Sequence, residues 1–508
     1  MPFKDAKRLT VLVGLAVFFL VVCFHLTSEP AAHFIPGATA PQPESAAPQP
    51  APDPPRQQAH TDDEDRENAL QGLEDSHQFP TDAGDAAAQE DAANAAENAL
   101  AGELQQPPPA GNMNNGGVVG HDQSQAGADN LTPTYQTISS QSTADGTFFS
   151  IDFGGKIAFN PNIIPHPSLD DTWIIVAQEV RAYDSDDFVE LFCDAVFQRD
   201  VLQCLEPPVA LPIAPTHGAG QCDGKLGFFN LNRGPHDARV FLGPDRPYVI
   251  FGSNSIPTCF GQFVQDFTAL VDWKGDQEVS EDDPFRTAAE LHRPLPWNPI
   301  EKNWFLFWDA GGQMFVHHDI SPARVFAQVA PDGTVGPDLA PAAASLDEKC
   351  LEKFMPKLTT SDEQSLHQAT NSLRVTMCRR SESSCVPNDE NTFIITIYHH
   401  KAIRNNRPMY EPYIMAFRQR PPFEVHSMSR HPLWIAGRAA EAGEGMSALL
   451  YVTSISWKNR EQRYHGYIDD ELFIAFGIED ERAGGIDVLA GDLLGELSRC
   501  RPSSGMTS

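Results

Sequence analysis

Two carboxylates separated by one residue form the first arrangement in this sequence that could do chemistry. Asp184 and Asp186 belong to an Asp-Ser-Asp, and carboxylates at this spacing can chelate a hard divalent cation that in turn binds a diphosphate. Chains that use the motif in this way place a nucleotide-binding half of alternating strands and helices before it. Here the β-rich part begins only shortly before Asp184, so the sequence favours an acidic loop between two strands.

Other common motifs of catalysis and metal binding are missing from the sequence. It contains no G-x-S-x-G, no H-E-x-x-H, no Walker A loop and no G-x-G-x-x-G. No C-x-x-C pair and no grouping of cysteine with histidine has the spacing of a zinc site. The sequence therefore supports neither a serine hydrolase, nor a zinc peptidase, nor a nucleotide triphosphatase, and it indicates no metal and no cofactor.

Three segments place polar and charged residues directly before an apolar run. They read FNPNIIPHP (159–167), GPHDARVF (234–241) and EKNWFLF (301–307). In a β-propeller, the starts of the innermost strands present residues to the central cavity, where a substrate can bind. The candidate site residues in these segments are Asn160, Asp237, Arg239, Lys302 and Asn303.

The elements that must position these residues are short strands. From Thr147 the sequence consists of β-rich runs with turns between them, and three hairpins are recognisable at 240–251, 304–317 and 325–335. Many short strands over this length predict a mainly β fold, which could be a propeller, a sandwich or a barrel. The recurrence of hairpins at the spacing of successive blades favours a propeller. Helical periodicity is limited to 361–372 and 488–497.

The same three segments resemble motifs of five-bladed β-propeller carbohydrate enzymes. FNPNIIPHP, GPHDARVF and EKNWFLF are similar to the N-P, G-x-E-D-P-R and K-N/D patterns of the mannoside phosphorylase and hydrolase family and of the related fungal and protozoan β-mannosyltransferases. The resemblance implies a five-bladed propeller with Asp237 as the general acid. It also implies that Arg239 binds substrate hydroxyls or phosphate and that Lys302 binds phosphate or a sugar phosphate. Asn160 would line the cavity, and Asn303, next to Lys302, would contact substrate.

The sequence departs from this family at two positions beside Asp237. His236 stands where the family has glutamate, and Ala238 stands where it has proline. Without that glutamate, one carboxylate remains where hydrolysis usually needs two. Transfer from a sugar phosphate needs only one acid or base from the protein. The sequence therefore predicts a glycosyltransferase-like protein that acts on mannose-type or related glycans.

Other functions stay open at this point. A catalytically silent, lectin-like propeller would tolerate the missing glutamate, because binding needs no acid. A glycoside hydrolase would need a second carboxylate near Asp237, for which Glu301, Asp309 and Asp470 are candidates. A purely structural role is open too, since Asp237 and Arg239 share one face of a strand and could form an ion pair.

The N-terminal part has the composition of a membrane anchor followed by a linker. Basic residues precede an uncharged apolar run from Leu9 to Leu26, and the positive-inside bias places the N-terminus in the cytosol. A cleaved signal peptide ending near Ala31 and Ala32 is the alternative. The Pro-, Ala- and acid-rich stretch that follows predicts a disordered linker. The predicted divisions are a cytosolic tail (1–8), a transmembrane signal anchor (9–26), a disordered stem (27–146), a β-propeller (147–480) and a C-terminal segment (481–508).

The charge of the chain limits its partners. With 69 acidic and 36 basic residues, the formal net charge is -33. A field of this sign repels phosphate backbones, so nucleic acid is not expected as a partner. The predicted partners are a glycan or sugar-phosphate substrate and a membrane, which the chain would contact through residues 9–26.

The cysteines fit an oxidising compartment. Of the nine cysteines, Cys23 lies in the predicted anchor and the other eight follow the stem, an even number that predicts disulfides. The plausible local bridges are Cys193–Cys204 and Cys378–Cys385. Asn130 begins an Asn-Leu-Thr glycosylation sequon in the stem. We therefore expect a single-pass type II protein of the Golgi or ER membrane, with its C-terminal domain in the lumen.

Overall fold

The computed structural model describes residues 134–180, 187–219, 222–231, 233–273, 283–358, 364–404, 407–439 and 449–500. The predicted tail and anchor, the sequon at Asn130 and the Asp184–Asp186 motif lie outside these residues. No helix among the residues that are described is long and apolar enough to span a membrane.

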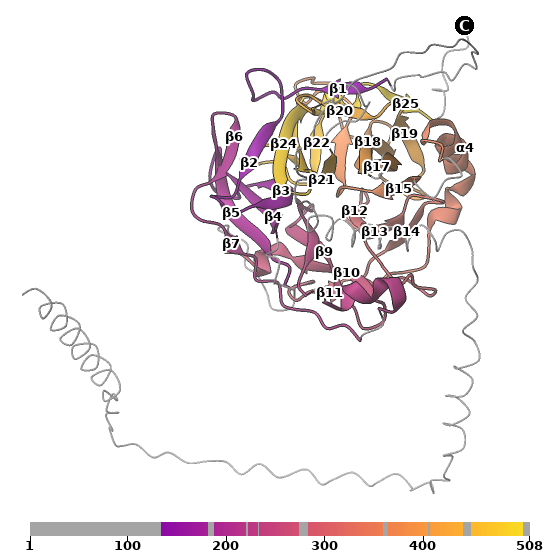
Figure 1. The fold of residues 1–508 in the computed structure, drawn as a ribbon. Coiled ribbons are helices and arrows are strands. Elements are labelled where there is room, and N and C mark those ends of the chain that lie inside the picture. The colour runs from indigo at the N-terminus through magenta and orange to yellow at the C-terminus, as the bar shows by residue number, and fades with distance from the viewer. Residues whose placement is uncertain are drawn as a thin grey trace, which may run out of the picture. The chain divides into compact units, whose positions relative to one another are not determined.

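Five groups of mainly antiparallel strands follow one another along the chain and surround a common centre (Figure 1). We call them blades 1 to 5. Blade 1 consists of β3 (Ala158–Pro165), β4 (Trp173–Glu179), β5 (Glu190–Gln198) and β6 (Val201–Cys204), with the short β7 (Val209–Ala210) beside β5. Blade 2 consists of β8 (His236–Leu242), β9 (Pro247–Asn254), β10 (Phe260–Asp266) and β11 (Ala289–Glu290).

The remaining blades differ in the number of their strands. Blade 3 has β12 (Phe305–Trp308), β13 (Met314–Asp319) and β14 (Val325–Gln328). Blade 4 has β15 (Gln364–Gln368) and β16 (Leu373–Thr376), which both pair with the long β17 (Thr392–Arg404), followed by β18 (Arg407–Arg418), β19 (Val425–Ser429) and β25 (Leu497–Arg499). Blade 5 has β21 (Leu450–Trp457), β23 (Glu471–Ile478), β24 (Arg482–Leu489) and β2 (Phe149–Asp152).

The ring closes between the last blade and the first. β2, from the N-terminal side of the chain, pairs antiparallel with β24 of blade 5 and parallel with β6 of blade 1. These pairings join blades 5 and 1 into one nine-stranded sheet. Because the two ends of the domain are hydrogen-bonded to each other, neither leaves a long open edge.

Buried apolar side chains fill the space between every two neighbouring blades. Each of five clusters draws on two adjacent blades, and together they connect the blades in the order 1-2-3-4-5-1. This cyclic order is that of a five-bladed β-propeller, in agreement with the expected mainly β fold. Representative pairs are Ile174 with Val240, Phe241 with Leu306, Phe307 with Phe417, Ile395 with Ile455, and Ile175 with Phe473.

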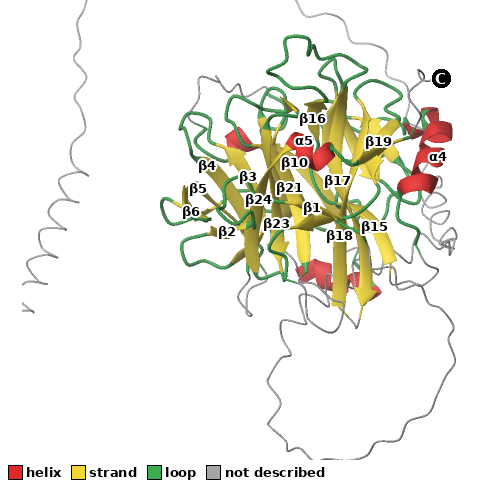
Figure 2. Ribbon diagram, turned by 90° about the horizontal axis from the view of Figure 1, so that it is seen from above, coloured by secondary structure: helices red, strands yellow, loops and turns green. Residues whose placement is uncertain are grey.

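Few elements lie outside the blades. The helix α4 (Ala344–Phe354) packs at the edge beside β19 (Figure 2). The other elements are α5 (Ala490–Leu494), the 3-10 helices η1 (Gly224–Leu231), η2 (Phe267–Ala269) and η3 (Ala340–Ala342), and the strands β1 (Gln136–Ile138) and β20 (Leu433–Ile435). The short strand β22 (His465–Tyr467) belongs to blade 4, where it pairs in parallel with β16.

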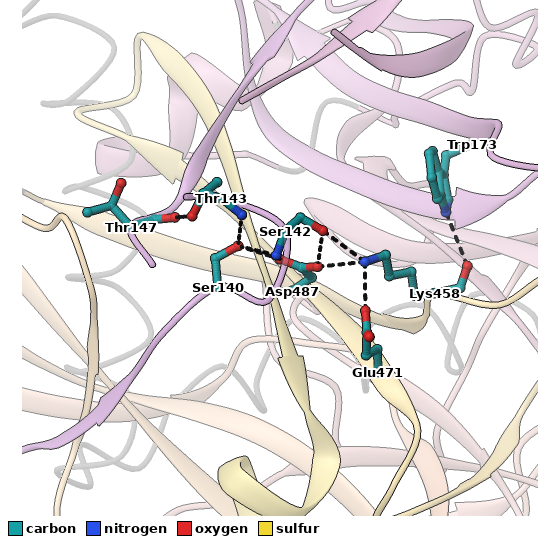
Figure 3. Close-up of polar contacts among 8 residues, drawn as sticks. All are labelled: Ser140, Ser142, Thr143, Thr147, Trp173, Lys458, Glu471 and Asp487. Atoms are coloured by element: carbon teal, nitrogen blue, oxygen red, sulfur yellow. Dashed lines mark hydrogen bonds and ion pairs between the residues drawn. The ribbon is translucent and has the colours of Figure 1, made fainter. Parts of the chain in front are cut away.

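The folded part begins earlier and ends later than the sequence predicts. β1 lies within the predicted stem, yet it pairs in parallel with β20. Close behind it, Ser140 and Ser142 donate hydrogen bonds to the buried carboxylate of Asp487, which also forms an ion pair with Lys458 (Figure 3). β24 and α5 lie beyond residue 480 and complete blade 5. The boundaries at 146 and 480 are therefore wrong, because both segments carry contacts that only the closed ring reveals.

Four disulfides connect the cysteines that follow the predicted stem. Cys193–Cys204 and Cys378–Cys385 form as predicted. Two further bridges join residues distant in the sequence: Cys222–Cys259, and Cys350–Cys500, which ties α4 to the end of β25. Spacing along the chain cannot reveal such long-range pairs.

The helix predicted at 361–372 is absent among the described residues of that range. Residues 364–368 instead form β15, which pairs with β17 from Gln364 opposite Ala402 to Gln368 opposite Tyr398. β17 extends well past the end of β16, and β15 supplies the backbone partners for that extension. Tertiary pairing here overrides a weak local preference for helix.

Candidate active site

Three of the predicted site residues have a left-handed backbone at the axial start of inner strands. Asn160 has φ 54°, Asp237 has φ 48° and Asn303 has φ 61°. Asn and Asp tolerate this conformation better than most residues. β-bulges interrupt β3 after Phe159 and β8 after His236, and such bulges re-aim side chains next to functional sites. We call the end of the propeller at which β3 and β8 begin the upper end.

Asp237 presents an exposed carboxylate at this upper end. Asn160 Nδ2 donates a hydrogen bond to Asp237 Oδ1 at 2.9 Å, and the backbone N–H of Asp237 donates to Gln178 Oε1 at 2.9 Å. Gly477 of β23 leaves the space that Asn160 occupies, because a Cβ at position 477 would lie 2.5 Å from Asn160 Oδ1. Blades 1, 2 and 5 therefore all hold the Asp237 carboxylate in place.

Arg239 ties the upper ends of three blades together. Its side chain is 4% exposed. Nε donates to the Ala369 carbonyl at 2.7 Å, Nη1 to the Asp237 carbonyl at 3.2 Å, and Nη2 to Asn303 Oδ1 at 3.3 Å. Among the contacts described, Arg239 bonds to the backbone of Asp237 and not to its carboxylate, so the two do not form the alternative ion pair. Its guanidinium positions Asn303 and the β8 bulge.

Two carboxyl groups that sequence reasoning missed lie close to Asp237. Asp480 sits in the turn between β23 and β24 and is partly buried; burial and the Asp237 charge raise its pKa to about 6. Glu190, at the start of β5, is fully buried, and its Oε1 accepts the Ala238 N–H at 3.1 Å. Burial, opposed by that hydrogen bond, raises the pKa of Glu190 to about 8. Neither residue belongs to a local motif that could have pointed to it.

The carboxylates predicted as possible partners of Asp237 lie elsewhere. Asp309 follows the far end of β12 and accepts the N–H groups of Gly311 and Gln313, each at 2.8 Å. Asp470 precedes β23 and pairs with Arg380 at 2.7 Å, whereas Asp480 follows the opposite end of that strand. An eight-residue strand spans about 26 Å. These two residues are thus at the lower end of the propeller.

Glu301 and Lys302 lie to one side of Asp237, on a groove of about 1120 Å³ that borders blade 3 and β15. Glu301 is buried and accepts a hydrogen bond from Arg293 Nε at 2.9 Å; burial, opposed by the Arg293 charge, raises its pKa to about 7. Asn303 lies on the same groove and links it to Arg239. The structure therefore gathers Asn160, Asp237, Arg239 and Asn303, and it places Lys302 next to this group.

His236, which stands where the mannoside phosphorylase and hydrolase motif has glutamate, packs against aromatic rings. The ring of His236 lies 3.6 Å from that of Phe188 and 5.3 Å from that of Phe260, measured between centroids. An aromatic contact has taken the place of a carboxylate at this position. Any second carboxylate must come from another blade, as Asp480 does.

Histidine and tyrosine side chains of blades 4 and 5 form a wall near Arg239. His399 is fully buried, its Nε2 accepts the Val452 N–H at 3.2 Å, and its ring lies 4.7 Å from that of Tyr451. Burial, with the nearby charges of His367 and Arg239, holds the pKa of His399 well below its usual range. His399 is consequently a neutral acceptor.

The described residues contain no group of three His, Cys, Asp or Glu side chains that could hold a metal ion. The Asp184–Asp186 motif, the sequence's candidate for cation binding, lies outside them.

No protein-family model matches this chain, and no curated protein matches it. Solved structures with weak similarity are glycan-degrading enzymes. The endo-1,5-α-L-arabinanase of Thermotoga petrophila RKU-1 is 9% identical, with a TM-score of 0.32, over 66% of this chain and 71% of that one. The endo-arabinase of Bacteroides thetaiotaomicron VPI-5482 is 9% identical, with a TM-score of 0.32, over 67% and 96%. The exo-β-1,3-galactanase 1,3Gal43A of Clostridium thermocellum is 9% identical, with a TM-score of 0.32, over 70% and 62%. Similarity this low assigns neither family nor activity, so both must be argued from the residues of this chain.

Proposed function

We propose that this chain is a glycan-acting enzyme whose centre lies at the upper end of blades 1, 2 and 5. The observation that carries the proposal is that Asp480 lies within reach of the charge of Asp237. One carboxyl is exposed and held by Asn160, and the other has a pKa raised to about 6 by burial and by the charge of the first. A carboxyl group that burial keeps protonated, close to an exposed carboxyl group, can divide acid and base roles with it.

The pair suits cleavage of a glycosidic bond. Asp480, which keeps its proton below about pH 6, protonates the departing oxygen. The Asp237 carboxylate acts from the other side of the sugar, on water or on the anomeric carbon. The resemblance seen in the sequence assigns the acid role to Asp237. The raised pKa of Asp480 instead favours Asp480 as the acid and Asp237 as the base or nucleophile.

The electrostatics of the centre favour a neutral glycoside over a sugar phosphate. Glu479 and Glu481 flank Asp480, and their charges contribute to its raised pKa. The nearest cation on β8, Arg239, already donates to two carbonyls and to Asn303. A cluster of carboxyl groups repels an anionic leaving group, so the phosphate-binding roles implied for Arg239 and Lys302 are not part of this proposal.

Transfer to a glycan acceptor is the second candidate. The groove beside Asn303 has a volume of about 1120 Å³, enough for an acceptor next to the reacting sugar. When the Asp237 carboxylate attacks the anomeric carbon, transfer and hydrolysis share this first step and differ in whether a hydroxyl of the acceptor or water attacks next. If the chain binds glycans but does not turn them over, a lectin-like function remains.

We also propose that residues 9–26 anchor the chain and that the propeller lies in the lumen of the Golgi or ER. The four disulfides support an oxidising compartment. Protease protection of sealed microsomes tests this: full protection of the propeller is expected, and digestion without detergent contradicts it.

A donor panel tests the enzymatic proposal. The full-length chain is produced in an oxidising host and incubated with neutral glycosides of mannose, arabinose and galactose, with sugar 1-phosphates and with nucleotide sugars. Mass spectrometry follows the donors and distinguishes transfer to water from transfer to an added glycan. Consumption of a neutral glycoside that stops in Asp237→Asn but continues in Asp200→Asn, an exposed turn residue of blade 1, supports the proposal. Glycan binding without turnover would leave the lectin-like function.

A further inference from the structure

The groove beside blade 3 contains a buried histidine with unsatisfied ring nitrogens. His318 lines the groove and is 3% exposed. Within the part of the chain that is described, neither Nδ1 nor Nε2 of His318 has a hydrogen-bond partner. Its ring packs on Trp304, with 4.2 Å between centroids, which fixes its orientation. Buried polar atoms are nearly always satisfied, so two orphaned nitrogens in one ring that lines a cavity indicate a ligand.

The protonation state of the His318 ring indicates which chemical groups the ligand can present to it. Burial, assisted by the nearby charge of Arg293, lowers the pKa of His318 to about 3. The ring is therefore neutral under ordinary conditions, with one nitrogen that donates and one that accepts. A hydroxyl group, which both donates and accepts, matches this ring better than a phosphate, which mainly accepts.

The charges around the groove agree with a neutral ligand. Arg293 forms ion pairs with Glu301 at 2.9 Å and with Asp319 at 3.0 Å, so its positive charge is already balanced. Asp338 adds a further carboxylate to the lining, where Lys302 is the one other cation among the residues that the structure describes. An anion in this groove would face more negative than positive charge.

Hydrogen bonds connect one wall of the groove to the Asp237 centre. Asn303 lines the groove and accepts a hydrogen bond from Arg239, which also donates to the Asp237 carbonyl. Gln368 lines the groove as well and donates to the carbonyls of Asn303 at 3.0 Å and His318 at 2.8 Å. The groove and the Asp237 centre are thus coupled through Arg239, Asn303 and Gln368.

We propose that this groove is a subsite for a neutral sugar unit and that His318 binds two of its hydroxyl groups. The proposal rests on the proposed glycan-acting function and extends it, because it specifies that the unit beside the reacting sugar is uncharged and where it is held. His318 is a binding residue here and takes no part in bond cleavage.

Two variants of nearly equal shape isolate the hydrogen bonds. His318→Asn keeps a donor and an acceptor, whereas His318→Leu has neither. The full-length chain, in a detergent without sugar, is titrated with mannobiose, arabinobiose and galactobiose, and separately with inorganic phosphate. His426→Phe is the matched control, since His426 stacks on Phe393 and does not line the groove.

The subsite predicts that His318→Leu loses about tenfold or more in affinity for the disaccharide that binds, and that His318→Asn keeps most of it. The control should bind as the unmodified chain does. Equal loss in both variants, or no loss in either, overturns the role of His318. Competition by inorganic phosphate that depends on His318 overturns the neutral ligand.

If the His318 variants fail to fold, a crystal structure of the unmodified chain tests the subsite instead. In a crystal structure with the bound disaccharide, a hydroxyl should lie within hydrogen-bonding distance of the His318 ring, and a disaccharide placed elsewhere contradicts the subsite. The proposed function is tested separately, by whether turnover is lost in Asp237→Asn. Failure of the subsite and failure of the proposed function are therefore distinguishable. If no saccharide binds, the subsite is overturned.

Discussion

Asn160 of β3 donates a 2.9 Å hydrogen bond to the carboxylate of Asp237 on β8, so adjacent blades meet through two side chains at the propeller axis. Both residues have a left-handed backbone, and both lie at a β-bulge. A conformation of this kind costs about 1–3 kcal/mol per residue and persists at sites where function needs the resulting orientation. The pair therefore locates the centre more sharply than either residue alone.

The first prediction concerns this hydrogen bond. Asn160→Gly removes the amide and keeps the left-handed backbone, because glycine adopts it without strain. We expect turnover to fall about tenfold through the loss of one charge-assisted hydrogen bond, with little change in thermal stability. Steady-state kinetics and thermal denaturation check both parts. Asn160→Ala, which lacks the amide and strains the backbone, should lose stability as well; unchanged turnover in both variants contradicts the role of Asn160.

The second prediction concerns Glu190 and pH. Its pKa is raised to about 8 by burial, from an ordinary value of 4.5, so the folded chain keeps a proton that the unfolded chain has lost. Stability conferred by this group is therefore full below about pH 4.5 and falls as the pH rises to about 8. Glu190→Gln should weaken this decline and gain stability over the parent as the pH increases, because the amide oxygen can still accept the Ala238 N–H. Urea denaturation at several pH values measures the free energy of unfolding of both proteins. The same pH dependence in the parent and in Glu190→Gln would contradict the prediction.

The third prediction compares two disulfides. Cys350–Cys500 closes a loop of 150 residues and Cys378–Cys385 one of 7. Chain-entropy arguments give about 5 kcal/mol of stabilisation for the first and about 2 kcal/mol for the second. Replacing both cysteines of a pair by alanine should therefore lower stability much more for the long-range bridge, as chemical denaturation will show. Equal losses would contradict the dependence of the stabilisation on loop length.

The fourth prediction concerns the contact of the N-terminal segment with blade 5. Burial alone would raise the pKa of Asp487, but hydrogen bonds from Lys458, Ser140 and Ser142 outweigh it and hold the pKa below 3.8 (Figure 3). The resulting stability is present above that value and is lost as the pH falls further. Asp487→Ala should cost about 2–4 kcal/mol at neutral pH by leaving Lys458 with fewer partners. Glu471→Ala, which removes the more exposed partner of Lys458, should cost much less; equal costs contradict this account.

The sequence predicts the local features of this protein well. The hairpin at 240–251 forms β8 and β9, the one at 304–317 forms β12 and β13, and the two bridges between nearby cysteines are present. Each depends on a turn or spacing within a few residues. The candidate residues Asn160, Asp237 and Asn303 could be found for the same reason, because each stands at the start of an apolar strand.

Features that depend on ring closure could not be predicted in this way. Asp480 lies in an ordinary-looking acidic turn, and it matters only because blade 5 closes against blade 1, which in turn packs on blade 2. Glu190 appears as the polar start of a strand until the fold buries it beneath Ala238. The first strand of the fold, β1, lies in a stretch whose composition predicts a stem, because its stabilising partners are more than two hundred residues away.

The pH dependence of kcat/KM tests the central claim most directly. With Asp480 as the proton donor, kcat/KM of the unmodified chain for a neutral glycoside should fall as the pH rises above about 6, where Asp480 loses its proton. Asp480→Asn and Asp237→Asn should both be inactive, while Asp200→Asn follows the parent. An alkaline limb that persists unchanged in Asp480→Asn, or full activity in Asp237→Asn, would contradict a centre built on this carboxyl pair.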